Sequence, residues 1–173
     1  IEALDTTIRS EEDITRYTDK PILALLPELD ADVLQGLETD DASAADTITH
    51  TAPKSSFAEG IKTLRTNLTF MSPDDPPRTI LVTSPGPGEG KTISSINMAI
   101  AMAQSGSRTL LVDTDLRRPR IHRALGLDKS PGVSGLIRDN APVDGAVQAT
   151  DIDNLHCVTS GEVPPNPSHM LHS

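Results

Sequence analysis

Cysteine, tyrosine and tryptophan are nearly absent from this sequence of 173 residues, which holds one cysteine, one tyrosine and no tryptophan. The single thiol, Cys157, excludes a disulfide bond within the chain and favours a reducing compartment, in which we expect a buried structural cysteine rather than a reactive one. No apolar run approaches the ~20 residues of a membrane-spanning helix. We therefore expect these residues to form a soluble, cytosolic piece of protein.

Basic residues are also scarce: 15 lysines and arginines stand against 25 aspartates and glutamates, which gives a net charge of −10. This balance argues against nucleic acid as the main partner, because phosphate backbones are bound by clustered cations. Residues 28–46 contain seven of the acids and no base. We interpret residues 28–52 as an acidic, solvated linker between a segment 1–27 and a domain that begins near Pro53 and spans residues 53–173.

Local patterns predict the elements on both sides of this linker. The capping-box pattern at Ser10–Asp13 begins a short helix, and the apolar run 21–27, closed by two prolines, is typical of a strand. After the linker, Ser56 and Glu59 cap a helix whose apolar residues recur at helical spacing, and this helix ends by Pro73.

The next elements define the fold class. Residues 79–83 (TILVT) and 109–112 (TLLV) are continuous apolar runs of the kind found in parallel strands that are buried on both faces. Between them, residues 92–106 carry apolar side chains along one helical stripe and end at a glycine. Strand, helix and strand at this spacing form a βαβ unit, so we predict a three-layer α/β fold with a mostly parallel sheet.

The loop between the first of these strands and the helix reads SPGPGEGKT, residues 84–92. Glycines let backbone amides approach a phosphate closely, and a helix N-terminus and a lysine add positive charge. We therefore favour a nucleotide loop over an ordinary glycine-rich turn, with Lys91 on the β- and γ-phosphates and the Thr92 hydroxyl on Mg²⁺. Pro85 departs from the usual pattern, which has glycine there. The expected nucleotide-binding residues of the loop are Gly86, Gly88, Glu89, Gly90, Lys91, Thr92 and Ile93.

Two aspartates follow the second apolar strand. Ligands of open α/β sheets lie at the carboxyl ends of the strands, and Asp113 and Asp115 would point the same way if strand geometry continued between them. They then suit Mg²⁺ coordination or acceptance of a proton from a hydroxyl. The alternative is a solvated acidic strand end that caps Arg117 or Arg118. A basic patch follows, and its arginines either neutralise phosphate charge or pair with aspartates: Arg117, Arg118, Arg120 and Arg123.

The motif Asp113-x-Asp115-x-Arg117, about twenty residues after Gly-Glu-Gly-Lys-Thr, resembles the second nucleotide motif of the bacterial tyrosine kinases. These kinases are fused to, or partnered with, membrane polysaccharide co-polymerases. Three further stretches resemble the juxtamembrane segment, the helix before the first strand and a later turn of that family: residues 7–13 with 21–27, residues 57–67, and residues 164–167.

The resemblance implies a P-loop NTPase-like kinase that uses ATP and Mg²⁺ and controls exopolysaccharide or capsule polymerisation and export. It implies a location on the cytoplasmic face of the bacterial inner membrane, reached through an upstream transmembrane segment, and a polysaccharide polymerase and export machinery as partners. Its third nucleotide motif and its tyrosine-rich tail would follow residue 173, so we expect this piece to be truncated and do not expect catalysis from it alone; Tyr17 is its sole tyrosine.

The resemblance also assigns roles to individual residues. The catalytic residues are Lys91, Asp113 and Asp115, the metal ligands are Thr92, Asp113 and Asp115, and Arg117 joins the nucleotide-binding residues. A ring-like homo-oligomer that phosphorylates in trans would form through Glu59, Lys62 and Arg65. The family has arginine where this chain has Lys62, which keeps the charge and loses the planar fork.

Two other functions stay open at this point. One is an ATPase switch of the septum-positioning and chromosome-partition type, which carries a second lysine where this chain has Gly86. The other is an assembly module whose nucleotide site governs oligomer state without phosphoryl transfer.

Overall fold

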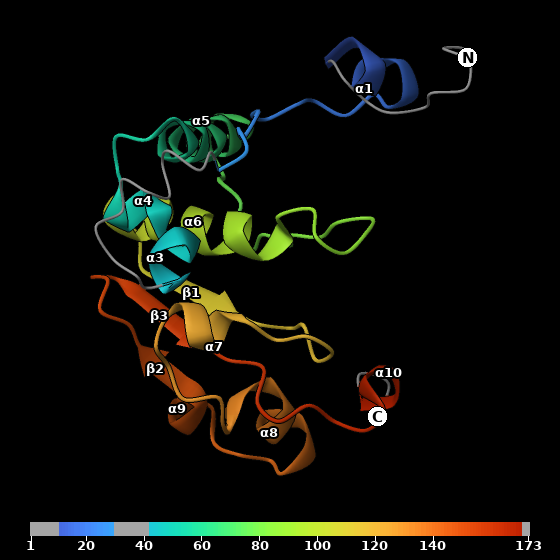
Figure 1. Cartoon of the computed structure of the whole chain (residues 1–173), viewed down its shortest axis with the longest axis vertical. Coiled ribbons are helices and arrows are strands. Elements are labelled where there is room, and N and C mark those ends of the chain that lie inside the picture. The colour runs from blue at the N-terminus through green and yellow to red at the C-terminus, as the bar shows by residue number, and fades with distance from the viewer. Residues whose placement is uncertain (1–10, 30–41, 171–173) are drawn as a thin grey trace.

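The computed structural model describes residues 11–29 and 42–170, shown in colour in Figure 1. Its helices are α1 (Glu11–Tyr17), α3 (Ala42–Asp46), α4 (Ile48–Thr51), α5 (Ser56–Phe70), α6 (Lys91–Gln104), α7 (Ile121–Ala124), α8 (Gly132–Arg138), α9 (Val143–Ala146) and α10 (Pro167–Met170). Its strands are β1 (Thr109–Val112), β2 (Val147–Ala149) and β3 (Leu155–Val158). The α/β class predicted from the sequence is confirmed.

The three strands form one mixed sheet in the order β1-β3-β2. β1 pairs with β3 in parallel, with Leu111 opposite Cys157, whereas β2 pairs with β3 antiparallel. Figure 1 shows α6 lying over the sheet, with α5 beyond it, and α8 and α9 at the other end of the molecule. The carboxyl end of β1 and the start of α6 therefore belong to one packed unit, which is what the site requires.

Apolar side chains of α6 hold this unit together from two sides. Ile96 and Ile100 are fully buried in a cluster with residues of α7 and β3, including Cys157. On the opposite side of α6, Ala101 packs in a second buried cluster with residues of α4 and α5. The helix predicted from Ser56 to before Pro73, the helix predicted over residues 92–106 and the strand predicted over residues 109–112 are confirmed as α5, α6 and β1, because each carries a local pattern that this packing can use.

Two predicted strands are absent. Residues 21–27 and 79–83 form no strand, and the Leu81 side chain is 84% exposed. A strand needs a neighbour that completes its backbone hydrogen bonds, and neither run is paired with a strand in the described part of the chain. Residues 21–27 instead run along α5, where the Asn67 side-chain amide donates to the Leu23 carbonyl at 2.6 Å.

The predicted solvated linker is wrong over residues 42–51. These residues form α3 and α4, and Ile48 is fully buried against Phe57, Ile61 and Ala101. The acidic residues of the whole segment suggested a solvated linker. Residues 42–45 and 47–51, however, are uncharged apart from one histidine and include an isoleucine that packs in the core. The core therefore spans the proposed boundary at Pro53, while residues 30–41 of the predicted linker lie outside the described residues.

Among the described residues, no helix has both the length and the apolar character needed to cross a membrane.

Candidate functional site

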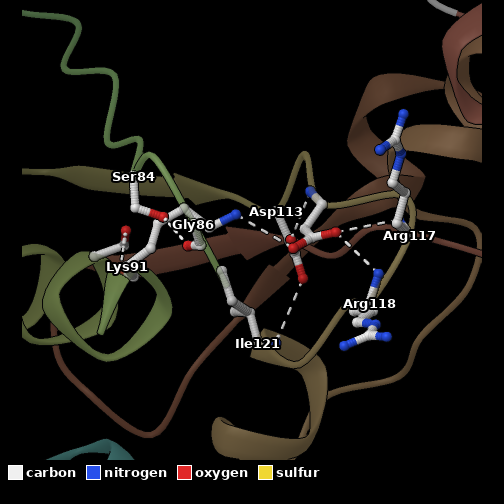
Figure 2. A network of polar contacts seen from close by, with 9 residues as sticks. Ser84, Gly86, Lys91, Asp113, Arg117, Arg118 and Ile121 are labelled. Carbon is white, nitrogen blue, oxygen red and sulfur yellow. Dashed lines mark hydrogen bonds and ion pairs between the residues drawn. The ribbon is translucent and has the colours of Figure 1, made fainter. Parts of the chain in front are cut away.

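The glycine-rich loop is shaped by two residues with left-handed backbone. Gly88 and Gly90 have φ of 81° and 78°, and Gly90 is the residue that precedes the first turn of α6. Only glycine adopts this conformation without strain. Figure 2 shows the loop closed on itself by the Ser84 hydroxyl, which donates to the Gly86 carbonyl at 2.9 Å. The chain thus enters α6 through a tight turn, as the sequence predicts.

The start of α6 supplies positive potential at this turn. The first hydrogen bond of the helix runs from the Ser94 amide to the Gly90 carbonyl at 2.9 Å, so the amides of Lys91, Thr92 and Ile93 have no partner within the helix. Partial positive charge gathers at such an end of a 14-residue helix. An anion placed at the loop would meet these amides together with the Lys91 ammonium group.

Lys91 reaches across to the residues that follow β1. Its Nζ lies 3.2 Å from Oδ2 of Asp115, and both side chains are about one third exposed. Figure 2 shows this contact bridging the loop and the end of the strand. The two motifs that the sequence placed 24 positions apart therefore meet, and in this structure a carboxylate supplies the counter-charge to the lysine.

Asp113 has a different environment from Asp115. Its side chain is nearly inaccessible, and its two oxygens accept hydrogen bonds from the Asp115 amide at 3.0 Å and the Ile121 amide at 3.4 Å. Burial raises the pKa of the Asp113 carboxyl, against the effect of these amides, and the neighbouring charge of Asp115 adds to the rise. Asp113 therefore holds together residues 113–121, which we name the acidic turn.

Asp115 is the more accessible, ionised carboxylate of the acidic turn. Its Oδ1 accepts from the amides of Arg117 and Arg118 at 3.1 and 2.9 Å. Burial alone would raise the pKa of Asp115, but these amides and the Lys91 ammonium outweigh it and lower the pKa. β1 ends at Val112, so the strand geometry that would point both carboxylates the same way does not continue.

The arginines after Asp115 do not gather at the loop. Arg117 donates through Nη2 to the Ser168 hydroxyl at 3.2 Å, and Figure 2 shows Arg117 and Arg118 on the side of the carboxylates away from Lys91. Arg120 pairs with Asp46, its Nη2 lying 2.9 Å from each carboxylate oxygen. Of the two roles left open for the patch, pairing with an aspartate is the one that Arg120 adopts.

The three residues expected at an oligomer interface lie on α5. Nζ of Lys62 lies 2.7 Å from Oε1 of Glu59 and also donates to the Pro53 carbonyl at 2.7 Å. Arg65 turns inward and donates to the Ala101 carbonyl on α6 at 3.2 Å. The predicted face is thus divided between a surface ion pair and an arginine that helps join α5 to α6.

The oxygen ligands near the loop fit a magnesium ion that binds together with a nucleotide. Within the described ranges, no three His, Cys, Asp or Glu side chains are grouped to hold a metal by themselves. Mg²⁺ commonly takes only one or two protein oxygens and completes its shell with phosphates and water. The ionised Asp115 carboxylate, next to the turn that carries Thr92, meets this requirement.

A second surface feature is separate from this site. A hollow of about 390 Å³ is lined by residues of α8 and of the loop after β3, among them Arg138, Asp139 and Glu162. It includes no residue of the glycine-rich loop or the acidic turn. Arg138 is already paired with Asp139 at 2.7 Å, so the hollow offers no free cation for a phosphate.

Sequence reasoning missed two buried residues that contact elements of the site. Asp46 was assigned to the solvated linker, and Asn97 was not considered, although its side chain is fully buried on α6. Asp46 contacts a residue 74 positions away, and no spacing rule connects the two. A buried asparagine on the apolar stripe of a helix was the only available signal, because buried polar groups need partners.

The glycine-rich turn, the helix that follows it and the two aspartates after β1 define a nucleotide-binding domain of the phosphate-loop class. Residues 80–163 match the model of the CobQ/CobB/MinD/ParA nucleotide binding domain. The tyrosine-protein kinase YwqD of Bacillus subtilis (strain 168) is 40% identical over 126 residues, which are 73% of this chain and 53% of that protein.

Two solved structures resemble the chain over nearly its whole length. The BceF tyrosine kinase domain is 32% identical with a TM-score of 0.82, and the match covers 96% of this chain and 67% of that one. The chimerical protein CapA2B2 is 33% identical with a TM-score of 0.78, over 95% of this chain and 66% of that one. The chain belongs to the bacterial tyrosine kinase family, and it spans about half the length of the curated relative YwqD.

Proposed function

We propose that this chain binds Mg·ATP between the glycine-rich loop and the acidic turn, as part of an ATP-dependent protein-tyrosine kinase. The contact between Lys91 and Asp115 supports this most, because it brings a phosphate-binding cation and an ionised carboxylate together at a helix N-terminus. Phosphoryl transfer needs little covalent chemistry from the protein and depends on such positioning and charge neutralisation.

In the proposed complex, Lys91 leaves Asp115 and contacts the β- and γ-phosphate oxygens, while amides of residues 88–92 surround the β-phosphate. The Thr92 hydroxyl and the Asp115 carboxylate would hold Mg²⁺, which would supply charge to neutralise the phosphates. Asp113 keeps the acidic turn in place through its two amide contacts. Arg117 would have to leave Ser168 to reach the nucleotide.

The proposed reaction transfers the γ-phosphoryl group to a tyrosine. The phenol oxygen forms a bond to the γ-phosphorus as the bond to the β,γ-bridging oxygen breaks, ADP leaves, and the phenol proton passes to a carboxylate of the acidic turn. Asp115 is the better placed of the two, because it is partly exposed whereas Asp113 is buried. The acceptor tyrosines would lie outside residues 1–173, on a neighbouring copy.

The resemblance to the family supports the wider setting. We propose a ring-like homo-oligomer on the cytoplasmic face of the bacterial inner membrane, attached through an upstream transmembrane segment and acting on exopolysaccharide or capsule polymerisation and export. Glu59 and Lys62 form an accessible ion pair on α5, and charged groups of a neighbouring copy could replace it. Arg65 would join them after release from Ala101.

Mass spectrometry of the full-length parent protein, incubated with ATP and Mg²⁺, tests this function. Phosphotyrosine should form in the wild type, disappear in Lys91→Met and persist in the control Lys129→Met, whose ammonium pairs with Glu162 at the surface. ATP hydrolysis without phosphotyrosine would instead indicate the ATPase switch. Unchanged polymer export in Lys91→Met, with export abolished by Glu59→Lys, would indicate an assembly module without phosphoryl transfer.

A further inference from the structure

The ion pair between Asp46 and Arg120 joins two segments that the sequence separates by 74 positions. Nη2 of Arg120 lies 2.9 Å from each oxygen of Asp46. The Asp46 side chain is 8% exposed and that of Arg120 is 59% exposed, so the carboxylate is the buried partner. A buried carboxylate needs a compensating partner, and burial raises the pKa of Asp46 against the opposing effect of Arg120.

The backbone of Asp46 is held independently by the helix that follows the glycine-rich loop. The buried Asn97 side chain donates to the Asp46 carbonyl at 2.8 Å and to the Ile93 carbonyl at 2.8 Å, and it accepts from the Thr49 amide at 2.7 Å. Figure 1 shows α3 beside α6, and α3 also contacts α7. Asp46 is therefore fixed to α6 through its backbone and to the acidic turn through its side chain.

Arg120 occupies a position that matters to the acidic turn. It directly precedes Ile121, whose amide donates to Asp113 at 3.4 Å, the longest contact that Asp113 makes there. Asp113 in turn accepts from the amide of Asp115, the residue that meets Lys91. A continuous series of contacts therefore runs from α3 to the lysine of the loop.

We propose that Asp46 is a positioning residue of the nucleotide site. Through Arg120 it holds the acidic turn against α6, and this keeps the Asp115 carboxylate where it would bind the Mg²⁺ of a magnesium–nucleotide complex. The expected effect of Asp46 on nucleotide binding rests on the proposed function, but the contacts of Asp46 exist without nucleotide. Asp46 also gives the segment before α5 a direct effect on the site, because any movement of α3 would release Arg120.

Hydrogen exchange of the nucleotide-free chain tests the positioning itself. In Asp46→Asn, which keeps the shape of the side chain and removes the negative charge that pairs with Arg120, we expect amides of residues 113–121 to exchange about ten-fold faster. Asp46→Glu should restore part of the protection. Asp139→Asn, which breaks a surface pair of the same kind, should leave these amides unchanged. Unchanged exchange in Asp46→Asn, or equal acceleration in β3, would overturn the proposal.

Measurements of nucleotide affinity test the effect of Asp46 on the nucleotide site. We expect Asp46→Asn to weaken binding of Mg·ADP about ten-fold while binding of ADP in EDTA is unchanged, because the Asp115 carboxylate acts on the nucleotide through Mg²⁺ and the nucleotide-free structure keeps Arg117 on Ser168. Adding Arg120→Gln should cause no further loss, since the two changes remove one interaction. Equal weakening with and without Mg²⁺ would contradict the positioning role. A wild-type chain that binds no nucleotide would contradict the proposed function, and hydrogen exchange alone would then decide this inference.

Discussion

Replacing Ile48 by alanine tests whether residues 42–51 belong to the folded core. The side chain is fully buried and packs against Phe57, Ile61 and Ala101. The substitution removes three carbons, worth about 2.4 kcal/mol of transfer free energy at about 0.8 kcal/mol each. Incomplete closure of the space left behind adds to this loss, so we expect the free energy of unfolding to fall by about 3 kcal/mol.

Equilibrium unfolding in urea measures this free energy, and thermal unfolding gives a second value. A loss of about 3 kcal/mol corresponds to a decrease in Tm of roughly 6–12 °C for a chain of this length. Val143→Ala serves as the control, because Val143 is an exposed apolar residue of α9 and its loss should change stability by no more than about 0.5 kcal/mol. If Ile48→Ala were as mild as the control, residues 42–51 would not be part of the core.

Three further predictions concern other parts of the molecule. Burial and, to a smaller extent, the charges of Arg123 and Lys129 lower the pKa of His122 below 6.5. As the pH drops through 6.5, the unfolded chain therefore takes up a proton before the folded chain does, and the free energy of unfolding falls. His122→Gln should flatten this part of a profile of stability against pH. Burial raises the pKa of Cys157 to about 12, so iodoacetamide at about pH 8 should label it only after unfolding, and labelling of the native chain would contradict its burial. Gly161→Ala should lower the free energy of unfolding, measured in urea, by more than about 4 kcal/mol, because a Cβ at this position would clash with Ser134 and with the Pro131 carbonyl. The control Gly106→Ala, also at positive φ but facing open space, should lower it by about 1–2 kcal/mol. Equal losses would contradict the packing at Gly161.

The elements that the sequence predicted well are those set by local chemistry. α6 follows from an apolar stripe that begins after a glycine, and the burial of Cys157 from the rarity of reactive thiols. The meeting of Lys91 and Asp115 agrees with the rule that ligands of open α/β sheets lie at the carboxyl ends of the strands, although residues 79–83, the strand expected before the loop, form no strand. Family membership could also be inferred from the two nucleotide motifs.

The features that could not be predicted depend on partners distant in the chain. Residues 79–83 have the composition of a strand, but pairing decides whether a strand forms, and they have no strand partner in the part of the chain that the structure describes. The burial of Asp46 depends on Arg120 and Asn97, which no local pattern connects to it. The different roles of Asp113 and Asp115 arise because β1 ends at Val112 and the chain turns at Asp113, where strand geometry was expected to continue through Thr114.

A crystal structure of the chain with Mg²⁺ and a non-hydrolysable ATP analogue tests the nucleotide site most directly. The site geometry predicts the triphosphate on the amides of residues 88–92, with the Lys91 ammonium moved from Asp115 onto phosphate oxygens and the metal beside Thr92. Nucleotide bound elsewhere, with Lys91 still 3.2 Å from Asp115, would contradict the assignment of this loop as the ATP site.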